Sequence, residues 1–222
     1  MPKGGVALRW VLLFFLLLPA WAQGQARFGF ALGEVEVLRG GRTLSGEIGM
    51  ELSREDRVRT GADGTAVIEL ENGSQLKLRE NTLINLETIA GDVQVELQEG
   101  SLFSRVERLA GRGYRVRTGA VVAGVRGTEF FVAFGRTIED AADVWLCVNE
   151  GAVEVTVEGA REPVTVREGE GINILSGSRI TEPRFYPWTE GLNWNMDPED
   201  GEVRDDTDLD QAYSDLLDQD YD

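Results

Sequence analysis

Residues 56–78 read DRVRTGADGTAVIELENGSQLKL and contain the pattern that organises most of the chain. Apolar side chains occur at every second position at Ala66, Ile68 and Leu70, and again at Leu76 and Leu78. Alternation with a period of two is typical of a strand that buries one face. The Asn72-Gly73 pair between the two runs favours a tight hairpin, because both turn residues tolerate positive φ. The stretch therefore predicts a strand, a glycine corner and a second strand.

The same pattern extends from about Gly33 to Leu175, where short alternating segments are separated by turns that contain glycine. The chain has 27 glycines and 6 prolines, which suits tight turns better than a low-complexity linker. The fold class expected is all-β, and the expected domain spans residues 34–176.

A six-residue repeat indicates that the unit is used more than once. RVRTGA occurs at residues 57–62 and again at 115–120. Stacked units of this kind close as a β-roll or solenoid, or fold as a sandwich of glycine-cornered hairpins, and short regular strands do not choose between these architectures.

The order of the segments resembles the FecR domain family over roughly residues 34–172. The typical run of that family is a Gly-Asp, a Thr-Gly, a strand, an Asp-Gly-Ser turn and a strand, and residues 56–78 follow it. Residues 125–130, VRGTEF, match the family's Val-Arg-Gly-Thr-x-Phe string, its most specific piece. Glu55 replaces a usual Gly and Asn72 a usual Asp, and neither change disturbs the turns.

The resemblance implies an envelope module. The best-known members are single-span regulators whose periplasmic part is similar to this chain and whose cytoplasmic end controls a sigma factor. Here no apolar run after residue 22 approaches the roughly 20 residues that a membrane-spanning helix needs. We therefore expect an exported FecR-like module, in the periplasm or at the cell surface, with no transmembrane span in the mature chain.

The N-terminus has the features of a secretory signal peptide. Lys3 and Arg9 precede an apolar run, and Ala20-Trp21-Ala22 provides small residues at the expected cleavage site. We expect residues 1–22 to be removed and residues 23–33 to form a short linker.

The C-terminal region changes in character twice. Residues 177–196 are rich in aromatic side chains and are expected to lie as a strap across the domain. Residues 197–222 form an acidic tail, and residues 189–222 contain 13 acidic side chains against the single Arg204. We expect this tail to be solvated and dispensable for folding, with one short amphipathic helix from Leu209 to Leu217.

Composition excludes several classes of function. With 22 Lys and Arg against 39 Asp and Glu, the net charge of −17 repels nucleic acid. The chain has no histidine, which removes serine and cysteine triads and His-containing zinc sites. Its single cysteine, Cys147, is expected to be a buried thiol on the face opposite Leu146 and Val148. We expect no catalysis, no cofactor and no metal site.

The residues considered for partner binding lie in three places. Arg126 and Thr128 of the VRGT string could bind an anionic ligand or a partner carboxylate, although an ion pair for Arg126 and a bend cap for Thr128 are the simpler roles. The other candidates are aromatic or apolar side chains of the C-terminal region: Trp188, Trp194, Leu209, Tyr213 and Leu216.

Taken together, the sequence predicts a non-enzymatic interaction or sensory module that binds another envelope protein in signalling or regulation. The alternative is a carbohydrate or cell-wall binding module, for which exposed Trp188 and Trp194 would supply stacking surfaces. An open tryptophan platform would favour the glycan, and tryptophans packed onto the sheet would favour the protein partner.

Overall fold

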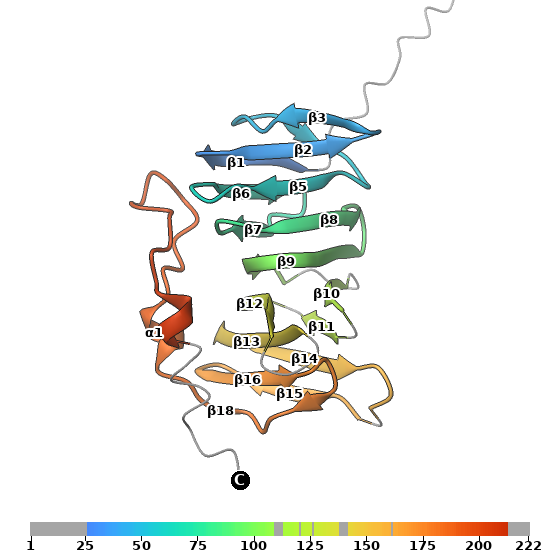
Figure 1. The fold of residues 1–222 in the computed structure, drawn as a ribbon, viewed down its shortest axis with the longest axis vertical. Helices are drawn as coiled ribbons and strands as arrows, with labels where there is room; N and C mark the ends of the chain where they lie inside the picture. The colour runs from blue at the N-terminus through green and yellow to red at the C-terminus, as the bar shows by residue number, and fades with distance from the viewer. Residues whose placement is uncertain are drawn as a thin grey trace, which may run out of the picture.

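The computed structural model describes residues 26–108, 113–119, 121–125, 127–137, 142–160 and 162–212. These residues form eighteen strands and the short helix α1 (Trp188–Gly191), so the predicted all-β class is confirmed. The strands are stacked like rungs along the long axis of the molecule (Figure 1).

The strands belong to two sheets, which we call A and B. Sheet A contains, in spatial order, β4 (Glu51–Leu52), β1 (Ala26–Leu32), β6 (Thr65–Leu70), β7 (Gln75–Leu78), the second half of β9 (Val93–Val106), β12 (Thr128–Thr137), β13 (Ala142–Glu150) and β16 (Glu170–Leu175), with β17 (Arg179–Ile180) and β18 (Arg184–Phe185) both paired to β16. Sheet B contains, in spatial order, β3 (Arg42–Ser45), β2 (Val35–Arg39), β5 (Arg57–Thr60), β8 (Leu83–Thr88), the first half of β9, β10 (Tyr114–Thr118), β11 (Val121–Val125), β14 (Ala152–Val157) and β15 (Val164–Arg167).

Strand β9 joins the two sheets at a glycine corner. Its first half pairs with β8 and β10 in sheet B, and its second half pairs with β7 and β12 in sheet A. Gly100, at the change of sheet, has a φ of 88°, and a Cβ there would lie 2.5 Å from the carbonyl oxygen of Asn81. Only glycine fits this corner, because both the backbone angle and the close approach exclude a side chain.

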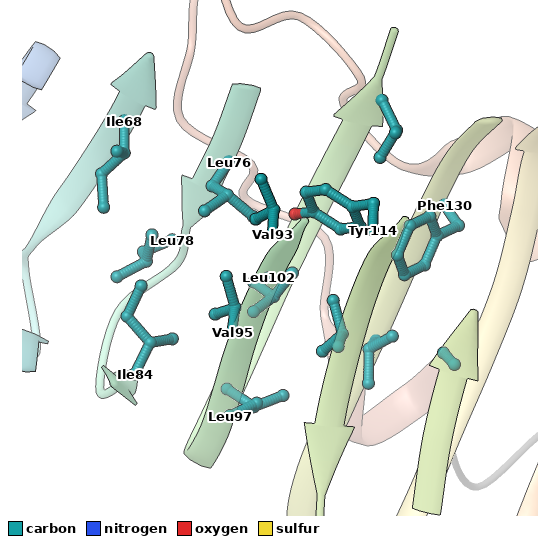
Figure 2. Packing of buried hydrophobic residues seen from close by; sticks show 14 of the residues in the cluster. Ile68, Leu76, Leu78, Ile84, Val93, Val95, Leu97, Leu102, Tyr114 and Phe130 are labelled. Atoms are coloured by element: carbon teal, nitrogen blue, oxygen red, sulfur yellow. The ribbon is translucent and has the colours of Figure 1, made fainter. Parts of the chain in front are cut away.

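The main core lies between the two sheets. Inward-facing residues of both sheets form one buried cluster, to which Ile68 and Leu76 contribute from sheet A and Val95 from sheet B (Figure 2). Tyr114 and Phe130 extend this cluster beyond β9, with ring centroids 6.4 Å apart and nearly perpendicular ring planes. The architecture is therefore a roll of two facing sheets, in which the chain changes sheet repeatedly.

The repeated hexapeptide begins two strands of the same sheet. Its first copy covers β5 and its second covers β10, both in sheet B. Val58 and Val116, at the same place in the repeat, are both buried in the main core. Thr60 and Thr118 are both buried at the ends of their strands. The repeat thus marks equivalent positions in the roll.

A second buried cluster covers the outer face of sheet A. There, Phe103, Phe131, Trp145 and Cys147 pack against apolar side chains from the C-terminal segment. We call residues 183–212 the C-terminal arm; its ribbon runs along one side of the stack (Figure 1). The arm contributes Tyr186, Leu192, Met196, Val203 and Ala212 to this cluster.

The expectation of a solvated tail is only partly correct for residues 197–212: most of their side chains are exposed, but Val203, Asp205 and Ala212 are buried. Val203 and Ala212 are 1% and 0% exposed, and Leu209 packs against the same cluster. A helical turn begins at Leu209 as predicted, and the Asp208 carboxylate accepts hydrogen bonds from the first free backbone amides. The rest of the predicted helix, with Tyr213 and Leu216, lies outside the described residues.

The described part of the chain contains no helix with the length and apolar composition that a membrane crossing requires.

Candidate functional site

An open groove lies on the outer face of sheet B, beside the VRGT string. The strand register places Arg115 of β10 opposite Gly124 of β11, Gly124 opposite Glu154 of β14, and Glu154 opposite Thr165 of β15. These residues form one row across four strands. Their neighbours along the strands, such as Val116 and Val153, point into the core, so the row faces outward.

Gly124 makes the floor of the groove. Gly124 lies inside β11, and a Cβ there would meet only the carbonyl oxygen of Glu154, at 3.8 Å. The backbone does not require glycine here, and glycine inside a strand often marks a close approach by a ligand or another chain. The groove has a volume of about 680 Å³ and is bordered by Arg108, Arg115 and Glu154.

Two arginines at this groove are available to a ligand. Arg108 and Arg115 are exposed, and no ion pair links either of them to an acidic side chain within the described residues. Arg117, on the same strand as Arg115, is instead held by Glu87 and Glu96 at 2.5 and 2.9 Å. Because a guanidinium binds carboxylates with two parallel hydrogen bonds, the groove can accept an anionic group.

In the VRGT string, Thr128 has a structural role. The Thr128 side chain is buried, and its hydroxyl donates to the carbonyl oxygen of Ala152 at 3.2 Å. Gly127 has a φ of 64°, as expected for a corner, and the side chain of Arg108 lies against it. Arg126 lies outside the described residues.

The tryptophans of the arm pack onto sheet A. Trp194 meets Phe103 edge-on, with ring centroids 5.1 Å apart, and its indole nitrogen donates to the carbonyl oxygen of Thr189 at 2.7 Å. Trp188 is also partly buried against the second cluster. The two side chains therefore do not form an open platform.

Lys77 is the residue that sequence reasoning missed. It lies on the outer face of β7 and is 0% exposed. Its ammonium group donates to the carbonyl oxygens of Asn193 and Asn195, the latter at 2.8 Å, and lies 4.2 Å from the ring centroid of Phe103. Burial lowers the pKa of Lys77 to about 8, partly opposed by the carboxylates of Asp205 and Glu129.

A buried ion pair fixes the arm near its end. Arg79 and Asp205 are 4% and 3% exposed, with 3.4 Å between a guanidinium nitrogen and a carboxylate oxygen. Arg79 also donates to the carbonyl oxygen of Thr207 at 3.0 Å. Arg105 of β9 pairs with Glu129 at 2.9 Å and donates to the carbonyl oxygen of Trp194 at 3.2 Å.

Comparison with known proteins finds one family model and two solved structures that are similar to this chain. Residues 56–154 match the family model described as FecR protein. Two crystal structures of a candidate anti-sigma factor from Parabacteroides distasonis ATCC 8503 are similar in fold. One, at 2.50 Å, is 22% identical with a TM-score of 0.50 over 62% of this chain and 67% of that chain. The other, at 1.65 Å, is 24% identical with a TM-score of 0.48 over 56% and 57%.

No curated protein matches the chain. This chain covers 57% and 67% of the lengths of the two solved proteins. At 22% identity, the likeness to the 2.50 Å structure shows a similar fold and nothing more. The family match spans β5 to β14 and includes Arg108, Arg115, Gly124 and Glu154. Residues 56–154 of this chain are therefore similar to the FecR family.

Proposed function

We propose that this protein is an exported, non-enzymatic regulatory module of the bacterial envelope that acts by binding a protein partner. The similarity to the FecR family supports the regulatory part of this proposal. The resemblance of residues 1–22 to a signal peptide supports export.

The observation that carries the proposal is the groove over Gly124. It lies largely within the residues that match the FecR family, it is open, and it presents Arg108 and Arg115 without acidic partners among the described residues. A partner that brings a carboxylate to this groove would find the geometry that guanidinium groups recognise best.

The carbohydrate alternative has less support. It required an open aromatic platform, and Trp188 and Trp194 pack against the second cluster instead. We therefore propose a protein partner, and we place its contact on sheet B.

Site-specific photo-cross-linking in the producing cell tests the proposal. A photo-reactive side chain in place of Thr165, at the end of the Arg115 row, should form an adduct with one envelope protein. The matched control places the same group at Thr43, an exposed residue of β3 on the same sheet. Equal labelling from both positions, or none from Thr165, would contradict a partner site at the groove.

Export has its own test. The mature protein recovered from the envelope should begin at or within a few residues of Gln23. Retention of Met1 would show that the N-terminal segment is not cleaved.

A further inference from the structure

Three basic side chains line the outer face of sheet A beneath the arm. Lys77 extends from β7, Arg79 follows the same strand, and Arg105 extends from β9. All three donate hydrogen bonds to backbone carbonyl oxygens of the arm. Lys77 bonds Asn193 and Asn195, Arg105 bonds Trp194, and Arg79 bonds Thr207.

These hydrogen bonds recognise the backbone of an extended segment rather than a particular amino-acid sequence. The carbonyl oxygens of three consecutive residues, 193–195, are each held by a basic side chain of the sheet. Two side-chain contacts add a preference for sequence. The Trp194 ring packs against Phe103, and the Asp205 carboxylate pairs with Arg79. Main-chain contacts with a few side-chain pockets are the usual basis of peptide recognition by a sheet.

Buried polar atoms at the contact between the arm and sheet A are less completely hydrogen-bonded than those of the main core. Buried polar atoms without a hydrogen-bond partner lie there among the described residues: Nε of Arg79 and the indole nitrogen of Trp145. Each such group costs free energy that a fully apolar or fully paired contact would not. The arm is therefore expected to open at a lower free energy than the two facing sheets.

We propose that the outer face of sheet A is a peptide-binding surface, now occupied by the chain's own arm, on which an extended acidic segment of a partner protein replaces the arm. The partner segment has an aromatic residue where Trp194 lies and a carboxylate where Asp205 lies. The charge supports this choice, because Lys77, Arg79 and Arg105 become exposed when the arm leaves. This surface is on the sheet opposite the groove, so the two sites can be tested separately.

Hydrogen exchange of the intact protein tests whether the arm opens by itself. Backbone amides that the arm bonds internally, such as those of Thr189 and Leu192, should exchange faster than amides of β9 and β12 in the middle of sheet A. Exchange of arm and sheet amides at one common rate, limited by global unfolding, would overturn the proposal.

Binding of a labelled peptide tests whether the surface accepts a chain in trans. The probe is a synthetic peptide of residues 185–207, and its control is the same composition in scrambled order. Trp194→Ala in the full-length protein weakens the bound arm, so the surface is vacant more often. We expect the peptide to bind this variant about tenfold more tightly than the native protein, because apparent affinity scales with the vacant fraction.

A second substitution shows that the peptide uses the same surface. Adding Lys77→Met to the Trp194→Ala variant should weaken peptide binding about tenfold, since the donor to the carbonyl oxygens of residues 193 and 195 is gone. Equal binding of the scrambled peptide, or peptide binding that is insensitive to Lys77→Met, would overturn the proposal. If Trp194→Ala does not fold, the exchange experiment on the native protein still decides it.

Discussion

The buried ammonium group of Lys77 makes the stability of the protein depend on pH in a specific direction. In the folded protein its pKa is about 8, lowered from 10.5 by burial. Between these values the unfolded chain binds one proton more than the folded protein. Since stability rises with pH wherever the unfolded state binds more protons, the contribution of Lys77 to the free energy of unfolding should increase from about pH 8 to about pH 10.5.

The size of the effect follows from the shift. A displacement of this extent at 1.36 kcal/mol per pKa unit corresponds to about 3 kcal/mol at the upper end of the window. The groups that face Lys77 are Asp205, Glu129, Arg105 and Arg79. The expected rise is assigned to Lys77, whose pKa burial lowers.

The assay is urea denaturation of the native protein and of Lys77→Met at several pH values from 7 to 10.5. Other titrating groups contribute equally to both proteins, so the difference between the two curves isolates Lys77. We expect the native protein to gain about 3 kcal/mol relative to Lys77→Met across the window. Parallel curves, or a relative loss of stability with rising pH, would refute the burial of a charged Lys77 beneath the arm.

Three further outcomes are expected. Gly127→Ala should destabilise the protein by about 1–3 kcal/mol, because φ is 64° and the new Cβ meets the side chain of Arg108, whereas Gly124→Ala should change the melting temperature little. The Cys147 thiol, whose pKa burial raises to about 12, lies beneath the arm and should react with a thiol reagent in the native protein only as fast as the arm opens. Removal of residues 197–222 should cost about 2–3 kcal/mol in a denaturation experiment, because the buried Val203 side chain leaves the second cluster and Asp205 no longer pairs with Arg79; an unchanged melting curve would restore the view of a dispensable tail.

Alternation along the strands was sufficient to predict the class of fold and the two sides of each strand. It placed Leu146 and Val148 opposite Cys147, and the structure puts the first two in the main core and Cys147 in the second cluster. It also located the repeat and the FecR resemblance, which the family match confirms. Alternation left the choice between roll and sandwich open, since that depends on which distant strands pair.

The same reasoning failed where the outer face of sheet A is covered. Alternation tells which residues share a face, but it does not tell whether another segment covers that face. Lys77 looked like an ordinary solvent-facing residue, and its burial requires carbonyl oxygens from residues more than a hundred positions away. A signal was present in β12 and β13, where Phe131, Trp145 and Cys147 are apolar on the face expected to meet water.

The prediction that the acidic tail is solvated failed in part for a related reason. Its charge density is typical of a solvated segment, yet Asp205 finds a buried arginine and Val203 and Ala212 find an apolar surface. Neither contact is local in sequence.

Quantitative affinity purification from envelope extract tests the central claim, that residues 56–154 act by binding a protein through the groove over Gly124. The comparison is between the native protein, Arg115→Glu at the groove and Arg42→Glu on β3, an exposed arginine of the same sheet without an ion pair among the described residues. We predict that Arg115→Glu reduces recovery of one partner protein about tenfold or more, that Arg42→Glu does not, and that all three proteins melt alike. Equal recovery of that partner by all three proteins would contradict the account.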